Sequence, residues 1–326
     1  MLRSTRRQAI MGAAATALAA SARGASAQTP LKVIVFPGMS NLAQFAALAQ
    51  GFYTKRGLAV ELVYTPNSTE LRDGLAAGRY QIAHAGVDNA VAQVETANVD
   101  LFIFMGGNNG FNNLIARPEI TSYEDFRGKV MAVDAVDTAF AILLYKMLDL
   151  KGIKRGSYDV KPVGGSLFRY QAMTKDKTYA ASMLNPPFSL QAVHVGLKDF
   201  GSAVGVVGPY QSDGGWVLRS WGQANADVLT RYIQANIEGM RWALNPANKD
   251  AMAAIIADRL KLSKEMAAES LAFSLSGYAV DGKFDLAGFK NSLQLRADML
   301  GTWGGKPPAP DKYLDFTYYQ RALAAM

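Results

Sequence analysis

The stretch QGFYTKRGLAVEL, residues 50–62, decides the fold class. Its Gly57 predicts a turn, and the apolar residues that follow predict a strand over residues 59–64. Before it, apolar residues at helical spacing predict a helix over residues 41–50. Further upstream, the mainly apolar residues 31–36 predict a buried strand that Pro37 ends. The order strand, helix, strand is typical of a βαβ unit with parallel strands.

Similar units follow along the chain. Asn67 and Glu70 resemble a capping box and predict a helix over residues 68–77. Further strands are predicted over residues 80–85 and 99–105. The pattern then starts again, with strands predicted over 129–133, 158–163 and 179–184 and helices over 139–150, 167–174 and 189–195. Corresponding strands, such as those around Val33 and Val130, lie roughly one hundred residues apart, which predicts two similar lobes.

The predicted fold class is α/β, with two lobes that each hold a mostly parallel sheet flanked by helices. Residues 113–117 and 215–219 are predicted to cross between the lobes. An all-helical tail follows, and the simplest interpretation returns it to the first lobe. The predicted organisation is therefore an export signal over 1–27, lobe 1 over 28–116 and 215–326, and lobe 2 over 117–214.

The first residues have the three parts of an export signal. Arg3, Arg6 and Arg7 form a basic start, residues 10–22 are weakly apolar, and Ala25-Ser26-Ala27 suits cleavage. Residues 5–10 resemble a twin-arginine signal, although ordinary Sec export remains open. An uncleaved anchor is the alternative, but the run is short and rich in alanine and glycine for a span of about 20 apolar residues. We therefore expect a soluble periplasmic protein.

Composition excludes several classes of protein. The net charge is +7, but residues 1–27 hold four arginines and no acid, so about +3 remains, too little to indicate nucleic-acid binding. The absence of cysteine excludes disulfides, thiolate metal sites and a cysteine nucleophile. His84 and His194 lack metal-ligand spacing, and His84, within an apolar strand, is expected in the core. No nucleophile elbow or P-loop occurs.

Four segments carry a resemblance to a known family: residues 50–62, 75–86, 123–133 and 184–188. They resemble the periplasmic solute-binding proteins of the aliphatic-sulfonate, taurine and nitrate type, a group that includes relatives of the thiamine-pyrimidine-synthesis proteins. The resemblance implies the type II periplasmic-binding-protein fold, hinge closure on a small organic molecule in the interlobe cleft, and delivery to an ABC permease and its ATPase. It also implies a monomer, without cofactor or enzymatic activity.

The resemblance places ligand-binding residues in the loops after the parallel strands. Carried over to this chain, these residues are Ser40, Asn41, Gly86, Val87, Asp88, Asp137, Thr138, Asn185 and Trp216. Helix N-termini present free N–H groups there, and an oxygen-rich ligand could accept from them. The alternative is that Ser40, Asp88 and Asp137 are simple helix caps. Among the aromatic residues, Trp216 is expected in the cleft, whereas Phe36, Phe111 and Phe188 are expected in the core more often than not.

Two carboxylates bear on the choice of ligand. Asp88 or Asp137 would repel an anion, and no Lys or Arg is evident in the same loops. We therefore hypothesise a neutral or amine-bearing ligand. Two alternatives to a transport protein remain open: an enzyme on the same fold with Asp88 or Asp137 as acid or base, and a ligand sensor that docks on a membrane receptor. The hinge is expected at residues 116–118 and 214–215.

Overall fold

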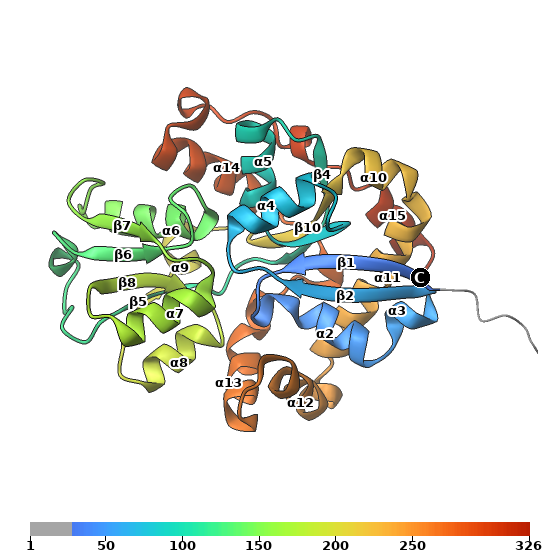
Figure 1. The fold of residues 1–326 in the computed structure, drawn as a ribbon, viewed down its shortest axis with the longest axis horizontal. Coiled ribbons are helices and arrows are strands. Elements are labelled where there is room, and N and C mark those ends of the chain that lie inside the picture. The colour runs from blue at the N-terminus through green and yellow to red at the C-terminus, as the bar shows by residue number, and fades with distance from the viewer. Residues whose placement is uncertain (1–27) are drawn as a thin grey trace, which may run out of the picture.

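The structure, a computed structural model, describes residues 28–326, so the predicted export signal over residues 1–27 lies outside the described residues. The chain forms two lobes, each built around a five-stranded sheet (Figure 1). The first sheet has the order β2 (Leu58–Tyr64), β1 (Thr29–Val35), β3 (Ile82–Gly86), β10 (Asp213–Leu218), β4 (Leu101–Asn108). The second has the order β7 (Asp159–Pro162), β6 (Val130–Val133), β8 (Tyr179–Leu184), β5 (Asn113–Ala116), β9 (Lys198–Ser202).

The two sheets share one topology. In each, three parallel strands are followed by one antiparallel strand and then by an edge strand. Strands β1, β2 and β3 thus correspond to β6, β7 and β8, as the sequence repeat predicted. Four of the five strands in each sheet therefore run in one direction. The antiparallel strands, β10 and β5, are the segments by which the chain enters each sheet after crossing from the other lobe.

Helices cover both faces of each sheet. Around the first sheet lie α2 (Leu42–Ala49), α3 (Phe52–Lys55), α4 (Ser68–Ala76), α5 (Asp88–Ala97), α10 (Arg219–Ala224), α11 (Ala226–Leu244), α12 (Lys249–Leu260), α13 (Lys264–Ser274), α14 (Leu286–Leu300) and α15 (Thr317–Ala324). Around the second lie α6 (Ala139–Asp149), α7 (Ser166–Lys175), α8 (Phe188–His194) and α9 (Val204–Val207). The predicted capping box forms, because Asn67 Oδ1 accepts from the Glu70 amide at 2.8 Å. None of these helices is long and apolar enough to cross a membrane.

The chain crosses between the lobes earlier than the sequence suggested. Residues up to 116 were assigned to lobe 1, yet β5 pairs with β8 and β9 in the second sheet. Likewise, Asp213 and Gly214 already pair within the first sheet. The crossings therefore occupy residues 109–112 and 208–212. The reason is that a short apolar run has the same pattern in either sheet, so the sequence cannot show which sheet it joins.

The helical tail does not return to lobe 1 alone. Helix α14 packs Phe289 and Leu293 into the core of the first lobe. Its Leu295 instead joins the core of the second lobe, beside α6. Lys146 of α6 lies 3.6 Å from Asp298 of α14. Helix α14, at the top of Figure 1, therefore contacts both lobes.

Candidate functional site

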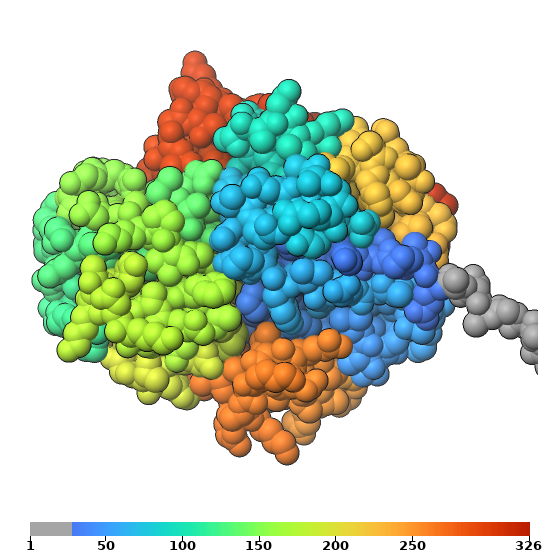
Figure 2. Space-filling view, viewed as in Figure 1, coloured from blue at the N-terminus to red at the C-terminus, as the bar shows by residue number. Residues whose placement is uncertain are grey.

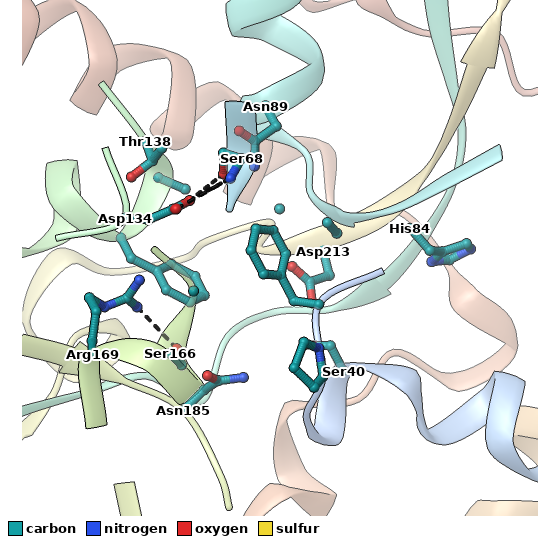
Figure 3. A pocket seen from close by; sticks show the side chains of 17 residues that line it. Ser40, Ser68, His84, Asn89, Asp134, Thr138, Ser166, Arg169, Asn185 and Asp213 are labelled. Carbon is teal, nitrogen blue, oxygen red and sulfur yellow. Dashed lines mark hydrogen bonds between the residues drawn. The ribbon is translucent and has the colours of Figure 1, made fainter. Parts of the chain in front are cut away.

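A cleft lies between the two lobes and leaves about 540 Å³ of space, part of which is open to solvent. Its walls come from the carboxyl ends of the strands in both sheets, where ligands of α/β proteins usually bind. Figure 3 shows its polar side chains. The lining residues are Phe36, Pro37, Ser40, Ser68, His84, Ala85, Gly86, Asn89, Asp134, Thr138, Ala139, Phe140, Gly165, Ser166, Arg169, Asn185 and Asp213.

The wall from lobe 1 carries a buried carboxylate, Asp213, at the start of β10. Its Oδ2 accepts a hydrogen bond from Asn108 Nδ2 at 3.0 Å. Burial raises the pKa of Asp213, while the Ser40 and Asn108 side chains act in the opposite direction. Ser40 itself lies in the short 3-10 turn Met39–Asn41, which follows β1.

His84, in β3, also faces the cleft from lobe 1. The ring is 6% exposed, and its Nε2 has no hydrogen-bond partner among the described residues. It contacts the aromatic rings of Phe104 and Tyr232. Burial lowers its pKa to about 3, so the ring is neutral at physiological pH. The expectation that His84 is a core residue therefore holds for its packing, although one face reaches the cleft.

The wall from lobe 2 carries the guanidinium of Arg169, in α7, which is 2% exposed (Figure 3). Four hydrogen bonds hold it in place. They run to Ser182 Oγ, Gly164 O, Ser166 Oγ and Met183 O, at 2.6–3.0 Å. A guanidinium has five N–H donors, so one remains for a further acceptor. Burial lowers the pKa of Arg169 to about 10, which leaves it charged at neutral pH.

Contacts across the cleft hold the lobes together in a closed arrangement, and Figure 2 shows the two lobes meeting along a seam. Asp134, which follows β6, accepts from the amide of Ser68 at 3.2 Å and from its hydroxyl. The Gly165 amide donates to Pro66 O at 2.8 Å, and the Met39 amide donates to Pro186 O at 3.2 Å. The Ser68–Asp134 contact places a carboxylate at the N-terminus of α4, where a negative charge is favourable.

Four of the predicted site residues line this cleft: Ser40, Gly86, Thr138 and Asn185. Thr138 precedes α6, and its hydroxyl donates to Ala135 O at 2.9 Å. Whether these residues bind a ligand stays a prediction.

The other five predicted residues do not line the cleft. Asn41 donates to Phe36 O at 2.7 Å and so holds the loop after β1. Val87 is fully buried in the core of lobe 1. Trp216 was expected in the cleft, but it is 0% exposed, packs in the same core, and donates to Gln93 Oε1 at 3.2 Å. That expectation is wrong because Trp216 lies within the sheet, paired with Ala83 and Ile103, whereas Asp213 begins β10 at the edge that borders the cleft.

Asp88 and Asp137, the remaining two, are both paired with arginines. Asp137 forms two hydrogen bonds with Arg72, at 3.0 and 3.3 Å. Partial burial acts to raise its pKa, but Arg72 lowers it further, so the net shift is downward. Asp88 is buried and lies 2.8 Å from Arg296. The ligand hypothesis built on these two carboxylates therefore loses its basis, since Arg72 and Arg296 offset their charges.

Sequence reasoning missed several polar lining residues, chiefly Ser68, Asp134, Arg169 and Asp213. A usable signal existed for Asp134, because it directly follows the apolar strand β6, as ligand-facing residues of parallel sheets do. No sequence signal distinguishes Arg169 from the exposed cations of other helices. Phe36, which was expected in the core more often than not, also lines the cleft.

Comparison with known proteins identifies the family. The family model described as NMT1/THI5 like matches residues 40–249, and the chain therefore belongs to the NMT1/THI5-like family. Curated protein sequences give no match.

Solved structures share the fold at low sequence identity. A ligand-binding component of an ABC-type import system from Staphylococcus aureus, with zinc bound, has a TM-score of 0.76 and 15% identity, covering 90% of this chain and 99% of that chain. The periplasmic nitrate-binding protein NrtA from Synechocystis PCC 6803 has a TM-score of 0.76 and 14% identity, over 92% and 89%. The alkanesulfonate-binding protein SsuA from Xanthomonas axonopodis pv. citri, bound to MOPS, has a TM-score of 0.70 and 15% identity, over 89% and 97%. These similarities establish the periplasmic-binding-protein fold.

The contact between Ser68 and Asp134 leads to a first prediction. Replacing Asp134 with alanine removes the acceptor for both Ser68 bonds, and hydrogen bonds to a charged group contribute about 1.5–3 kcal/mol. We expect the closed arrangement to weaken by that order. Hydrogen exchange of peptides that cover the first turn of α4 would then become faster. Ser68→Ala is the matched control, because it keeps the backbone bond and should have a smaller effect; unchanged exchange in Asp134→Ala would contradict the role given to this contact.

Proposed function

We propose that this chain is the solute-binding component of an ABC importer, which captures a small organic molecule in the cleft and delivers it to a permease. The cleft between two lobes of matching topology carries this proposal. Its walls combine the apolar Phe36, Pro37 and Phe140 with a few buried polar groups, the usual composition of a small-molecule site. Solved structures with this fold include a nitrate-binding protein, an alkanesulfonate-binding protein and a component of an ABC-type import system, which supports the proposal.

The mechanism that we propose is hinge closure. Residues 109–112 and 208–212, the two crossings, would act as the hinge, since the first links β4 to β5 and the second links α9 to β10. A ligand that contacts both walls favours the closed state over the open one by its differential affinity. The permease would then recognise the closed form. In this proposal lobe 1 comprises residues 28–108 and 213–326, and lobe 2 comprises residues 113–207.

The proposal includes export and a periplasmic location. It rests on the basic start, the apolar run and the small-residue cleavage site within residues 1–27. We propose that the protein acts as a monomer, without a cofactor, and without turning over its ligand.

A melting-temperature screen tests the function directly. The purified protein would be mixed with sulfonates, nitrate, aromatic carboxylates, pyrimidines and amines. A ligand at one hundred times its dissociation constant adds about 2.7 kcal/mol to the free energy of unfolding, so a binder would raise the melting temperature clearly. Recovery of the bound compound unchanged supports solute binding. A compound that is consumed would instead support the alternative of an enzyme on this fold.

A further inference from the structure

The charges on the walls of the cleft do not balance. Three ionisable side chains that line it are charged in their ordinary state: Asp134, Arg169 and Asp213. Just outside it, Asp137 pairs with Arg72, and Asp88 pairs with Arg296. Within the cleft, lobe 2 contributes one anion, Asp134, and one cation, Arg169, which interact electrostatically.

Asp213 is the carboxylate left over. Its hydrogen-bond partners are neutral: Asn108 donates to it, and Ser40 lies beside it. No Lys or Arg within residues 28–326 forms an ion pair with it. Among the other titratable groups, Tyr210 and Tyr278 interact electrostatically with Asp213, and His84 lines the same cleft. Burial keeps the two tyrosines protonated and His84 neutral, so none supplies a positive charge.

A buried carboxylate without a cation is costly, and proteins keep such groups mainly where they serve a function. Asp213 is 5% exposed, and what exposure it has faces the cleft. The apolar side chains of Phe36, Pro37 and Phe140 line the same space. The cavity thus combines a carboxylate that lacks a cationic partner with apolar walls.

We propose that the ligand is a small organic cation, whose positively charged nitrogen binds the Asp213 carboxylate while its apolar body lies against Phe36 and Phe140. This inference rests on the proposed solute-binding function and names its substrate class. It differs from the nitrate and alkanesulfonate named for two structures of the same fold, both of which are anions. A fully ionised Asp213 would disfavour an anion near lobe 1.

The pH dependence of binding follows from the same geometry. Since burial raises the pKa of Asp213, the folded protein holds this proton to a higher pH than the unfolded chain does. Unliganded stability should therefore fall as pH rises from the ordinary carboxyl range through the raised pKa. A cation binds the ionised form, so its affinity should increase over the same interval. A ligand with a fixed charge isolates this effect, because only the protein titrates.

The test compares isosteres that differ in charge. The probes are choline with 3,3-dimethylbutan-1-ol and 3,3-dimethylbutanoate, and benzylamine with benzyl alcohol and benzoate. Melting temperature and calorimetric affinity would be measured for the purified protein and for Asp213→Asn. We expect the cation of at least one set to bind tighter than its isosteres, and Asp213→Asn to weaken that cation at least tenfold. Choline binding should strengthen as pH rises from the ordinary carboxyl range through the raised pKa of Asp213.

Two further measurements keep the result interpretable. Without ligand, the Asp213→Asn variant should have a higher melting temperature than the wild type at neutral pH. This result would show that the variant folds. Asp258→Asn removes an exposed carboxylate and should change neither melting temperature nor affinity. Anions or neutral compounds that bind as tightly as cations, with the same affinity in Asp213→Asn, would overturn the inference and leave the proposed function standing. If no compound of these sets or of the wider screen binds, the proposed function fails as well.

Discussion

Replacing Arg296 with methionine should lower the free energy of unfolding by about 3–5 kcal/mol, the usual cost of leaving one buried charge without its partner. Arg296 and Asp88 have side chains only 2% and 4% exposed, with 2.8 Å between the guanidinium Nε and the carboxylate. Arg296 also donates to Asp137 O at 2.9 Å and so joins α14 to the loop before α6. Urea unfolding of the variant and the wild type measures the difference.

The pH dependence of this loss has a definite sign. Burial already raises the pKa of Asp88, and Arg296 only partly offsets the effect. Without Arg296 that pKa rises further, so Asp88 accepts a proton more readily in the folded variant. Protonation removes the uncompensated charge, and the loss of stability should therefore be smaller at pH 5 than at pH 8.

Two controls separate charge from packing. The double variant Arg296→Met with Asp88→Asn removes both charges and should recover much of the stability, since replacing both partners is often nearly neutral. Lys154→Met breaks an ion pair with Asp149 in which the lysine is 69% exposed, and should cost at most about 1 kcal/mol. A full loss in the double variant would show that Arg296 stabilises the protein by packing rather than by its charge.

Leucine at Gly165 should hold the lobes apart. A Cβ at this position would lie 2.9 Å from Phe36 Cδ1 and 3.4 Å from Pro66 O, both in lobe 1. The backbone φ of Gly165 is −59°, so leucine introduces no backbone strain, and the added side chain acts at the seam and at the cleft, which Gly165 also lines. Overpacking of this kind costs about 1–3 kcal/mol. The apparent affinity for a ligand of the closed state should fall roughly 5- to 150-fold.

Small-angle scattering and calorimetry measure the two consequences, a larger radius of gyration and weaker binding. Gly205→Leu is the matched control in the same lobe, because a Cβ there meets only Ser202 Cβ at 4.0 Å, and the residue is exposed. An urea midpoint close to that of the wild type would show that both lobes still fold. If Gly165→Leu keeps the wild-type radius and affinity, closure of this seam is not part of binding.

Much of the fold could be predicted from local sequence patterns. The strand over residues 179–184 was predicted with the bounds that the structure gives. Most other elements differ by one or two residues at their ends, where local signals are weakest. The short helix α3 and the strand β9 were missed, because four or five residues carry too little periodicity. The crossings were misplaced because strand partners depend on contacts far along the chain.

The backbone positions of the candidate site could be predicted from the sequence, but the ion pairs that balance its charged side chains could not. Loops after parallel strands could be located from the sequence, and Ser40, Gly86, Thr138 and Asn185 do line the cleft. The partners of the carboxylates could not be found in this way. Arg72 lies 65 positions from Asp137, and Arg296 lies 208 positions from Asp88, so only the folded chain brings each pair together.

The interrupted layout of the first sheet has a consequence for biosynthesis. Strand β10 lies between β3 and β4, yet all of the second sheet is encoded before it. A growing chain can therefore complete the second sheet while β3 and β4 still have unpaired edges. The apolar segment of β4, Leu101-Phe102-Ile103-Phe104-Met105, is a strand edge of the kind that pairs with other chains when exposed. Until the ribosome has released residues 213–218, that segment needs protection, and this interval is when molecular chaperones would matter most.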